Sequence, residues 1–115
     1  MALKRMVMEF GMGSDVHGGD YTKAALRGVQ DALHHSSLPM IRSLGIDPKT
    51  QMYVEVTVGV QQPDKVDAAK VAASLPHGKT TVTVVPGGLD LPHRDDGGDP
   101  VIIATVGIVV RLDLP

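Results

Sequence analysis

The chain has 115 residues, of which 43% are hydrophobic and 21% are charged, and its formal net charge is −2. These values are typical of one globular domain, and they exclude an intrinsically disordered chain and a basic nucleic-acid-binding surface. The absence of cysteine excludes disulfides and thiolate metal sites, and no apolar run is long enough to span a bilayer. We therefore expect a soluble cytoplasmic protein without a nucleic-acid or membrane partner.

Hydrophobic periodicity predicts strands that alternate with amphipathic helices. In chain order the prediction is a strand over 3–10, a glycine-rich connection over 11–20, a helix over 20–37, a short helical segment over 38–45, a strand over 52–61, a helix over 62–78, a strand over 79–89, a polar loop over 92–100 and a strand over 101–112. The strand over 101–112 is apolar on both faces, which places it in the middle of a sheet. Asp20 and Asp64 are the expected N-caps of the two long helices.

The element order β-α-β-α-β-β predicts a single α/β domain covering residues 1–115. Helical crossovers imply parallel strands in a mixed sheet, with both helices on one face. The order matches the chorismate-mutase-like fold of small trimeric enzymes, whose sites lie between subunits. The other sheet face carries polar side chains such as Glu55 and Thr57, so it can meet water or another subunit. We therefore expect a homo-oligomer, most simply a trimer.

Three methionines lie in or beside the first predicted strand. Met6 and Met8 share one face of that strand with Phe10. Together with Met12, these methionines are interpreted as core filler rather than as a metal or cofactor site.

The glycine-rich connection carries the most specific motif in the chain. Gly11, Gly13, Asp15, His17 and Gly18 fit the pattern G-x-G-x-D-x-H-G. The surrounding segment, GMGSDVHGGDYTKAA, resembles the signature of a small, functionally uncharacterised family of bacteria and plants. This resemblance implies that the motif is the functional centre, and it implies no reaction.

A shorter segment, GSDVH, is similar to the G-x-D-x-H segment of methylerythritol cyclodiphosphate synthases, which are trimeric metalloenzymes. In that family the Asp and His are metal ligands with a further His, so the resemblance implies a metal at Asp15 and His17. The i, i+2 spacing also places both side chains on one side of an extended segment, which suits Zn²⁺, Mn²⁺ or a coupled acid–base pair. A zinc site needs another protein ligand, and the candidates are Asp20, His34, His35, His77 and His93.

Backbone N–H groups are the other candidate ligand-binding groups, at Gly11 to Gly13 and at Gly87 and Gly88. Parallel strands bring their carboxyl ends to one edge of the sheet, where ligands gather. We therefore expect one pocket that contains Asp15, His17 and Gln62, with His93 or His77 as an additional histidine. The candidate ligand-binding residues are Gly11, Gly13, Gly18, Asp20, Gln62, Gly87, Gly88 and His93.

Two functional interpretations remain open. In the first, the protein is an enzyme that acts on a small polar metabolite by hydrolytic or acid–base chemistry, with Asp15 orienting His17 or sharing a metal with it. In the second, it is a non-catalytic ligand-binding or assembly protein, in which Asp15 caps a turn and the glycine-rich motif is structural. Under the first interpretation, Asp15→Asn and His17→Ala leave folding nearly intact and abolish ligand or metal binding.

Overall fold

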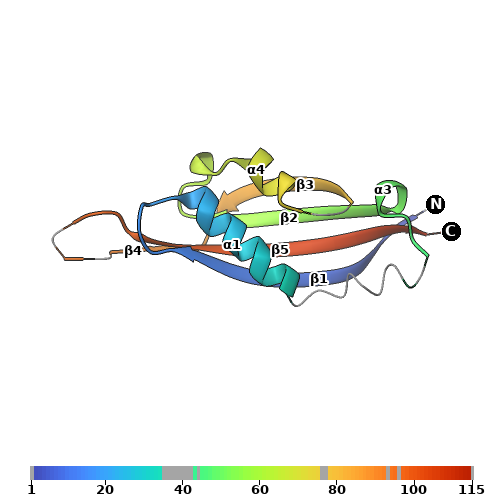
Figure 1. Cartoon of the computed structure of the whole chain (residues 1–115), viewed down its shortest axis with the longest axis horizontal. Helices are drawn as coiled ribbons and strands as arrows, with labels where there is room; N and C mark the ends of the chain where they lie inside the picture. The colour runs from blue at the N-terminus through green and yellow to red at the C-terminus, as the bar shows by residue number, and fades with distance from the viewer. Residues whose placement is uncertain are drawn as a thin grey trace.

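Two strands of 14 residues set the length of the molecule. β1 (Ala2–Asp15) and β5 (Val101–Leu114) pair antiparallel, from Ala2 opposite Leu114 to Asp15 opposite Ile102. The computed structural model describes residues 2–34, 43, 45–75, 78–92, 94–95 and 97–114. The chain is elongated, with extents of 58 × 23 × 18 Å, and both termini lie at the same end (Figure 1).

The sheet is mixed and has the strand order β1-β5-β2-β3. β2 (Met52–Val60) pairs antiparallel with β5 and parallel with β3 (Lys79–Pro86). The short β4 (Leu89–Leu91) pairs with the beginning of β5. The predicted central position of the last strand is confirmed, as is the single α/β domain with helices packed on a mixed sheet.

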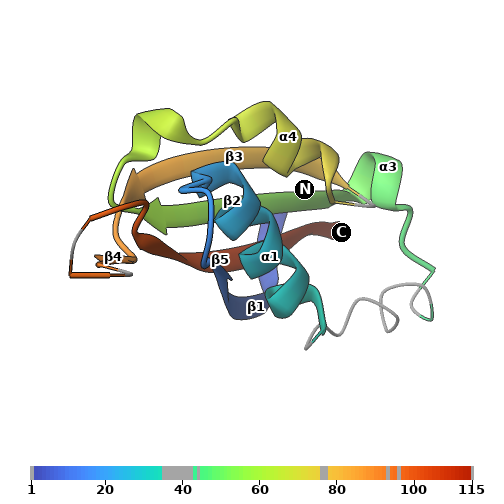
Figure 2. The same ribbon diagram turned by 60° about the vertical axis from the view of Figure 1, so that its left-hand side comes forward.

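The helices lie on one face of this sheet (Figure 2). α1 (Tyr21–His34) crosses β1 and β5, and α4 (Ala68–Ala73) packs beside β3. A single-turn helix, α3 (Pro48–Gln51), precedes β2, and a 3₁₀ turn, η1 (Pro63–Lys65), follows it. Most of the predicted helical segment over 38–45 lies outside the described residues.

One of the two predicted helix N-caps is confirmed, and the other is wrong. Asp20 caps α1, since its Oδ1 accepts a hydrogen bond from Lys23 N at 3.0 Å. The prediction that Asp64 caps the second helix is wrong, because Asp64 lies inside η1 and Val66 is extended. Asp67 is the N-cap of α4, and its Oδ1 accepts from Lys70 N at 3.2 Å.

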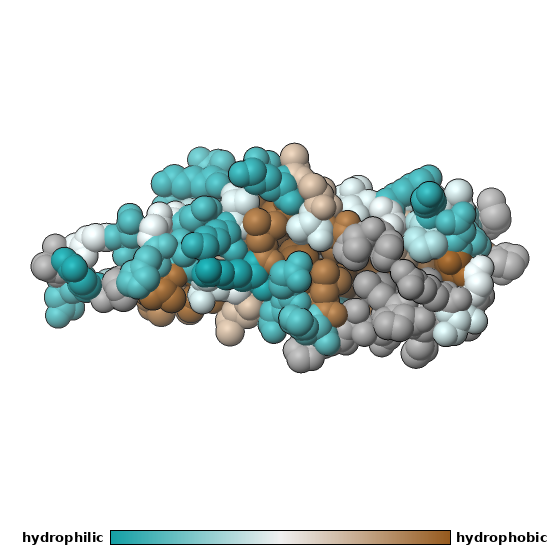
Figure 3. Space-filling view, viewed as in Figure 1, coloured by the Kyte–Doolittle hydropathy of each residue, from teal (hydrophilic) through white to brown (hydrophobic). Residues whose placement is uncertain are grey.

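Aliphatic side chains from the sheet and the helices form the core. In β2 and β5 every second side chain is buried beneath the helices, which is the pattern of a sheet covered on one face. The buried hydrophobic residues are Tyr21, Ala24, Ala25, Val29, Ala32, Met52, Val54, Val56, Val58, Val60, Val71, Ile102, Ala104, Val106, Ile108, Val110 and Leu112. On the outer surface of this layer hydrophilic side chains predominate, with hydrophobic ones visible between them (Figure 3).

The methionines of β1 lie outside this core, so their interpretation as core filler is wrong. Met6, Met8 and Met12 are 49%, 43% and 60% exposed. The side of β1 that faces α1 instead carries Gly11 and Gly13, because only glycine leaves room for the helix there.

Candidate functional site

The first two glycines of the motif bring β1 and α1 into backbone contact. The connection predicted to begin at residue 11 begins instead after Asp15, because residues 11–15 continue β1 and pair with β5. A Cβ at Gly13 would overlap backbone atoms of Ala24 and Gly28 in α1, and a Cβ at Gly11 would overlap Gly28 and Ala32. These glycines therefore have a packing role, and they do not line the hollow beside His17.

The same helix also satisfies backbone groups of β1. Asp31 Oδ2 accepts a hydrogen bond from Met12 N at 2.9 Å. Arg27 NH1 donates to the carbonyl oxygen of Ser14 at 2.7 Å. α1 is thus fixed to β1 by side-chain hydrogen bonds as well as by close packing.

Asp15 is a buried carboxylate at the end of β1, with 2% of its surface exposed. Its Oδ2 accepts a hydrogen bond from Asp20 N at 2.8 Å, which closes the turn between β1 and α1. Its Oδ1 lies 3.8 Å from Lys23 Nζ and 3.8 Å from Arg27 NH1. These contacts join the end of β1 to the first turns of α1.

This environment does not suit a divalent metal. Two cationic side chains, Lys23 and Arg27, already lie beside Asp15, and they would repel a metal cation there. Within the described ranges, no three His, Asp or Glu side chains lie close enough together to hold a metal ion. Of the candidate ligands, His35, His77 and His93 lie outside those ranges, and the exposed His34 ends α1.

His17 lines a hollow of about 300 Å³ between two glycine-containing loops. The other lining residues are Val16, Gly18, Arg94, Gly97, Gly98 and Asp99. Gly18, Gly97 and Gly98 have φ values of 98°, 105° and 95°, which L side chains rarely adopt. The hollow therefore depends on glycine on both sides, and it combines an imidazole, a guanidinium and a carboxylate.

The hollow beside His17 contains only one of the three residues, Asp15, His17 and Gln62, that were expected to share a pocket. Neither Asp15 nor Gln62 lines the hollow beside His17. Gln62 instead donates from Nε2 to the hydroxyl of Tyr21 at 3.0 Å. Asp20, also a predicted ligand-binding residue, serves as the cap of α1.

Tyr21, Gln62 and Asp90 form a second polar cluster, which the sequence analysis missed. Tyr21 is 4% exposed, and its hydroxyl donates to Asp90 Oδ2. Burial raises the pKa of Tyr21, and the adjacent Asp90 raises this pKa further. No local pattern joins these residues, because Tyr21 and Asp90 are 69 positions apart.

The predicted glycine pair, Gly87 and Gly88, belongs to the connection from β3 to β4. Gln61 Nε2 donates to the carbonyl oxygens of both glycines, at 3.0 and 3.2 Å. Gly88 has a φ of 60°, and a Cβ there would overlap the carbonyl oxygen of Ile103. Gly87 borders a different hollow, on the sheet face that carries no helix.

In the part of the chain that the structure describes, no helix is long and apolar enough to cross a membrane.

Comparison with known proteins places the chain in a family without assigning an activity. No curated protein matches it. The chain is similar to a crystal structure of an FtsZ-like protein of unknown function from Nostoc punctiforme, with 37% sequence identity, a TM-score of 0.85 and coverage of 99% of both chains. A family model described as a conserved hypothetical protein matches residues 5–110. The chain therefore belongs to the Lin0512 family of conserved hypothetical proteins.

Proposed function

We propose that the protein binds a small polar metabolite in the hollow beside His17 and acts on it by acid–base chemistry. The observation that carries this proposal is the lining of the hollow, where His17, Arg94 and Asp99 meet three glycines. Imidazole is the side chain that most readily exchanges protons near neutral pH. A guanidinium binds carboxylate or phosphate groups through paired N–H donors.

In this proposal Asp15 is a positioning residue rather than a metal ligand or a catalytic partner. Its hydrogen bond with Asp20 N and its contacts with Lys23 and Arg27 fix the turn that carries His17. The proposed reaction, including any hydrolysis, therefore proceeds without a metal at Asp15. His17 supplies the acid–base group, and Arg94 holds an anionic group of the metabolite.

The proposed working form is a closed homo-oligomer. The β-α-β-α-β-β order of elements, which resembles that of the small chorismate-mutase-like oligomers, supports this proposal. An assembly role without catalysis is the second candidate. It is favoured by the purely structural contacts of Gly11, Gly13 and Asp15, which account for most of the motif without a ligand.

A ligand screen with two site variants tests the first proposal. Thermal unfolding is measured with a panel of small carboxylates and phosphates, for the unmodified protein, His17→Ala and Arg94→Ala. His34→Ala is the matched control, since it makes the same change at an exposed histidine away from the hollow. We expect at least one compound to raise the melting temperature of the unmodified protein and of the control, and to have no effect on the site variants.

Two outcomes contradict the proposal. If a stabilising compound acts equally on His17→Ala and on the unmodified protein, the binding site lies elsewhere. If the site variants bind normally and a bound compound shows no turnover by NMR in any variant, the assembly role is favoured instead.

A further inference from the structure

The sheet face without helices is unusually apolar at β1. Met8, Phe10 and Met12 project from this face and are 43%, 66% and 60% exposed. The strand register continues the apolar surface to Leu89 and Leu91 of β4, which are also exposed. A sheet face that meets water usually carries polar side chains, and a contiguous apolar surface marks an interaction site.

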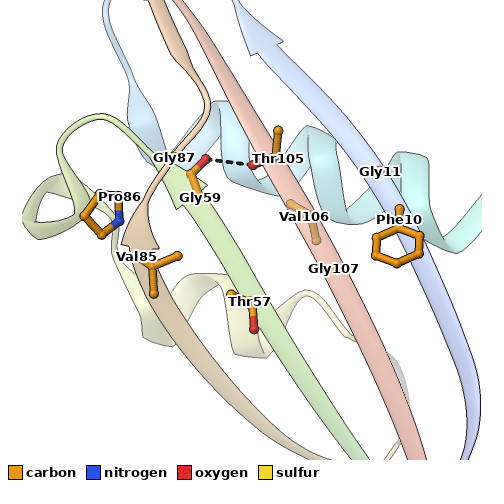
Figure 4. A pocket seen from close by; sticks show the side chains of 10 residues that line it. All are labelled: Phe10, Gly11, Thr57, Gly59, Val85, Pro86, Gly87, Thr105, Val106 and Gly107. Atoms are coloured by element: carbon orange, nitrogen blue, oxygen red, sulfur yellow. Dashed lines mark hydrogen bonds between the residues drawn. The ribbon is translucent and has the colours of Figure 1, made fainter.

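A hollow of about 440 Å³ lies beside Phe10 on the same face (Figure 4). We call it the glycine hollow, because Gly59, Gly87 and Gly107 line it and contribute no side chains. Thr57, Val85 and Thr105 are among its other lining residues. The Thr105 hydroxyl donates to the Gly59 carbonyl oxygen at 3.5 Å, so part of the polar lining is already satisfied.

We propose that this face binds a second copy of the chain, with Phe10 of one copy seated in the glycine hollow of the next. Phe10 and Thr57 both lie opposite Gly107 in the strand register, on either side of β5. The projecting ring and the hollow are therefore neighbours on one surface. A two-fold axis between them places each ring over the other copy's hollow, which is the arrangement of an isologous interface.

The size of the face agrees with this occupant. A strand spacing of about 4.8 Å and a rise of about 3.3 Å per residue give the four long strands a footprint of roughly 700 Å². A stable dimer buries about 800 Å² per partner, so one such contact would use essentially the whole face. A small ligand would leave Met8, Met12 and the β4 leucines exposed.

The shape of the chain also favours face-to-face contact. Its radius of gyration is 15.6 Å, whereas a compact chain of this length has about 13 Å. Pairing through the β1 edge is disfavoured, because Asp31 already accepts from Met12 N and Arg27 already donates to Ser14 O. The sheet face without helices also carries Arg5, Glu55 and Arg111, and Arg111 Nε lies 3.0 Å from Glu55 Oε1, so charged groups border the apolar surface as they do at the rim of a protein interface.

This inference does not depend on the ligand site beside His17, and light scattering tests it directly. We expect the unmodified protein to have the mass of a dimer, or of a larger assembly with an even number of subunits, at micromolar concentration. Phe10→Asp should weaken the association by at least about 30-fold, as expected for a buried aromatic anchor. Gln30→Asp is the matched control, because Gln30 is an exposed residue of α1, and it should retain the mass of the unmodified protein.

Cross-linking provides a readout that does not require Phe10→Asp to fold. The chain has no cysteine, so Phe10→Cys and Thr57→Cys each introduce a single thiol. Packed sheets lie about 10 Å apart, which a short bismaleimide spans. We expect a mixture of the two variants to give more covalent dimer than either variant alone. Gln30→Cys mixed with Thr57→Cys should give little.

Two outcomes would overturn the proposal. A monomeric mass for the unmodified protein would mean that the face has another occupant, such as a different protein or a lipid surface. An oligomer that Phe10→Asp leaves intact, with equal cross-linking in the Gln30 and Phe10 mixtures, would place the subunit interface elsewhere.

Discussion

Gly13 of β1 and Gly28 of α1 meet backbone to backbone. A Cβ at Gly28 would lie 3.3 Å from Gly13 N and 2.6 Å from Val106 Cγ2, and a Cβ at Gly13 would overlap Gly28 N. The motif glycine and the helix glycine therefore form one contact, which sets how closely α1 approaches the sheet. Because Asp15 and His17 follow directly on this strand, the contact also fixes where the candidate site lies.

Gly13→Ala should destabilise the protein by at least about 2 kcal/mol, because the added methyl group meets backbone atoms that cannot rotate away. Ser14→Ala is the control, since it changes the neighbouring residue of the same strand and leaves the backbone contacts of Gly13 in place. Urea denaturation at equal protein concentrations measures both. Similar free energies of unfolding for the two variants would mean that glycine at position 13 is not needed for the close approach of α1 to β1.

Asp15→Ala should destabilise the protein by about 1–3 kcal/mol, because it removes a buried carboxylate and leaves Asp20 N without its acceptor in a part-buried hydrogen bond. Asp15→Asn keeps an acceptor oxygen and should cost less. This replaces the expectation that changes at Asp15 leave folding nearly intact, which assumed an exposed side chain. Asp95→Ala, at an exposed carboxylate, is the control for chemical denaturation. An Asp15→Ala variant as stable as this control would contradict the structural role.

Asp67→Ala should cost about 1 kcal/mol, because the Asp67 carboxylate accepts the Lys70 N–H that α4 itself leaves unpaired. Asp64→Ala should change stability by less than about 0.5 kcal/mol, since Asp64 is exposed within η1. The same denaturation measurement compares the two variants. The opposite order would restore Asp64 as the cap.

The sequence predicts the fold well where a strand has a single dominant periodicity. In β2 the alternation of Val54, Val56 and Val58 with polar residues leaves no ambiguity, and the apolar character of β5 places it centrally. In β1 the same alternation separates methionines from glycines but does not show which set meets the helix. Gly11 and Gly13 lie on the helix side because Gly28 lets the backbone of α1 approach β1 there. This close approach is a feature of tertiary packing, which the alternation within β1 does not reveal.

The candidate site was harder to predict for a related physical reason. Glycine next to aspartate and histidine is typical of a loop, so the continuation of β1 to Asp15 was missed. The role of Asp15 then depends on Lys23 and Arg27, which reach it only because α1 folds back along β1. The contact between Tyr21 and Asp90 joins the beginning of α1 to β4, and no short motif contains both residues.

The cluster of Tyr21, Gln62 and Asp90 predicts that the free energy of unfolding falls at alkaline pH. We call this fall the alkaline limb. The pKa of Tyr21 is raised above its ordinary value of 10.0, first by burial and then by Asp90. The unfolded chain therefore loses this proton at a lower pH than the folded chain does. The stabilisation is fully present below about pH 10 and is lost as the pH rises through the folded-state pKa.

Tyr21→Phe removes this titrating group, so we expect the free energy of unfolding to fall less steeply above pH 10 than in the unmodified protein. Near neutral pH the variant should be less stable, because Gln62 and Asp90 each lose a hydrogen-bond partner. Tyr53→Phe removes the other tyrosine without touching either partner, so it should keep the steeper alkaline limb. Chemical denaturation between pH 8 and pH 11, together with tyrosinate absorbance, measures the difference. Parallel alkaline limbs for Tyr21→Phe and the unmodified protein would show that the Tyr21 proton is not held by this cluster.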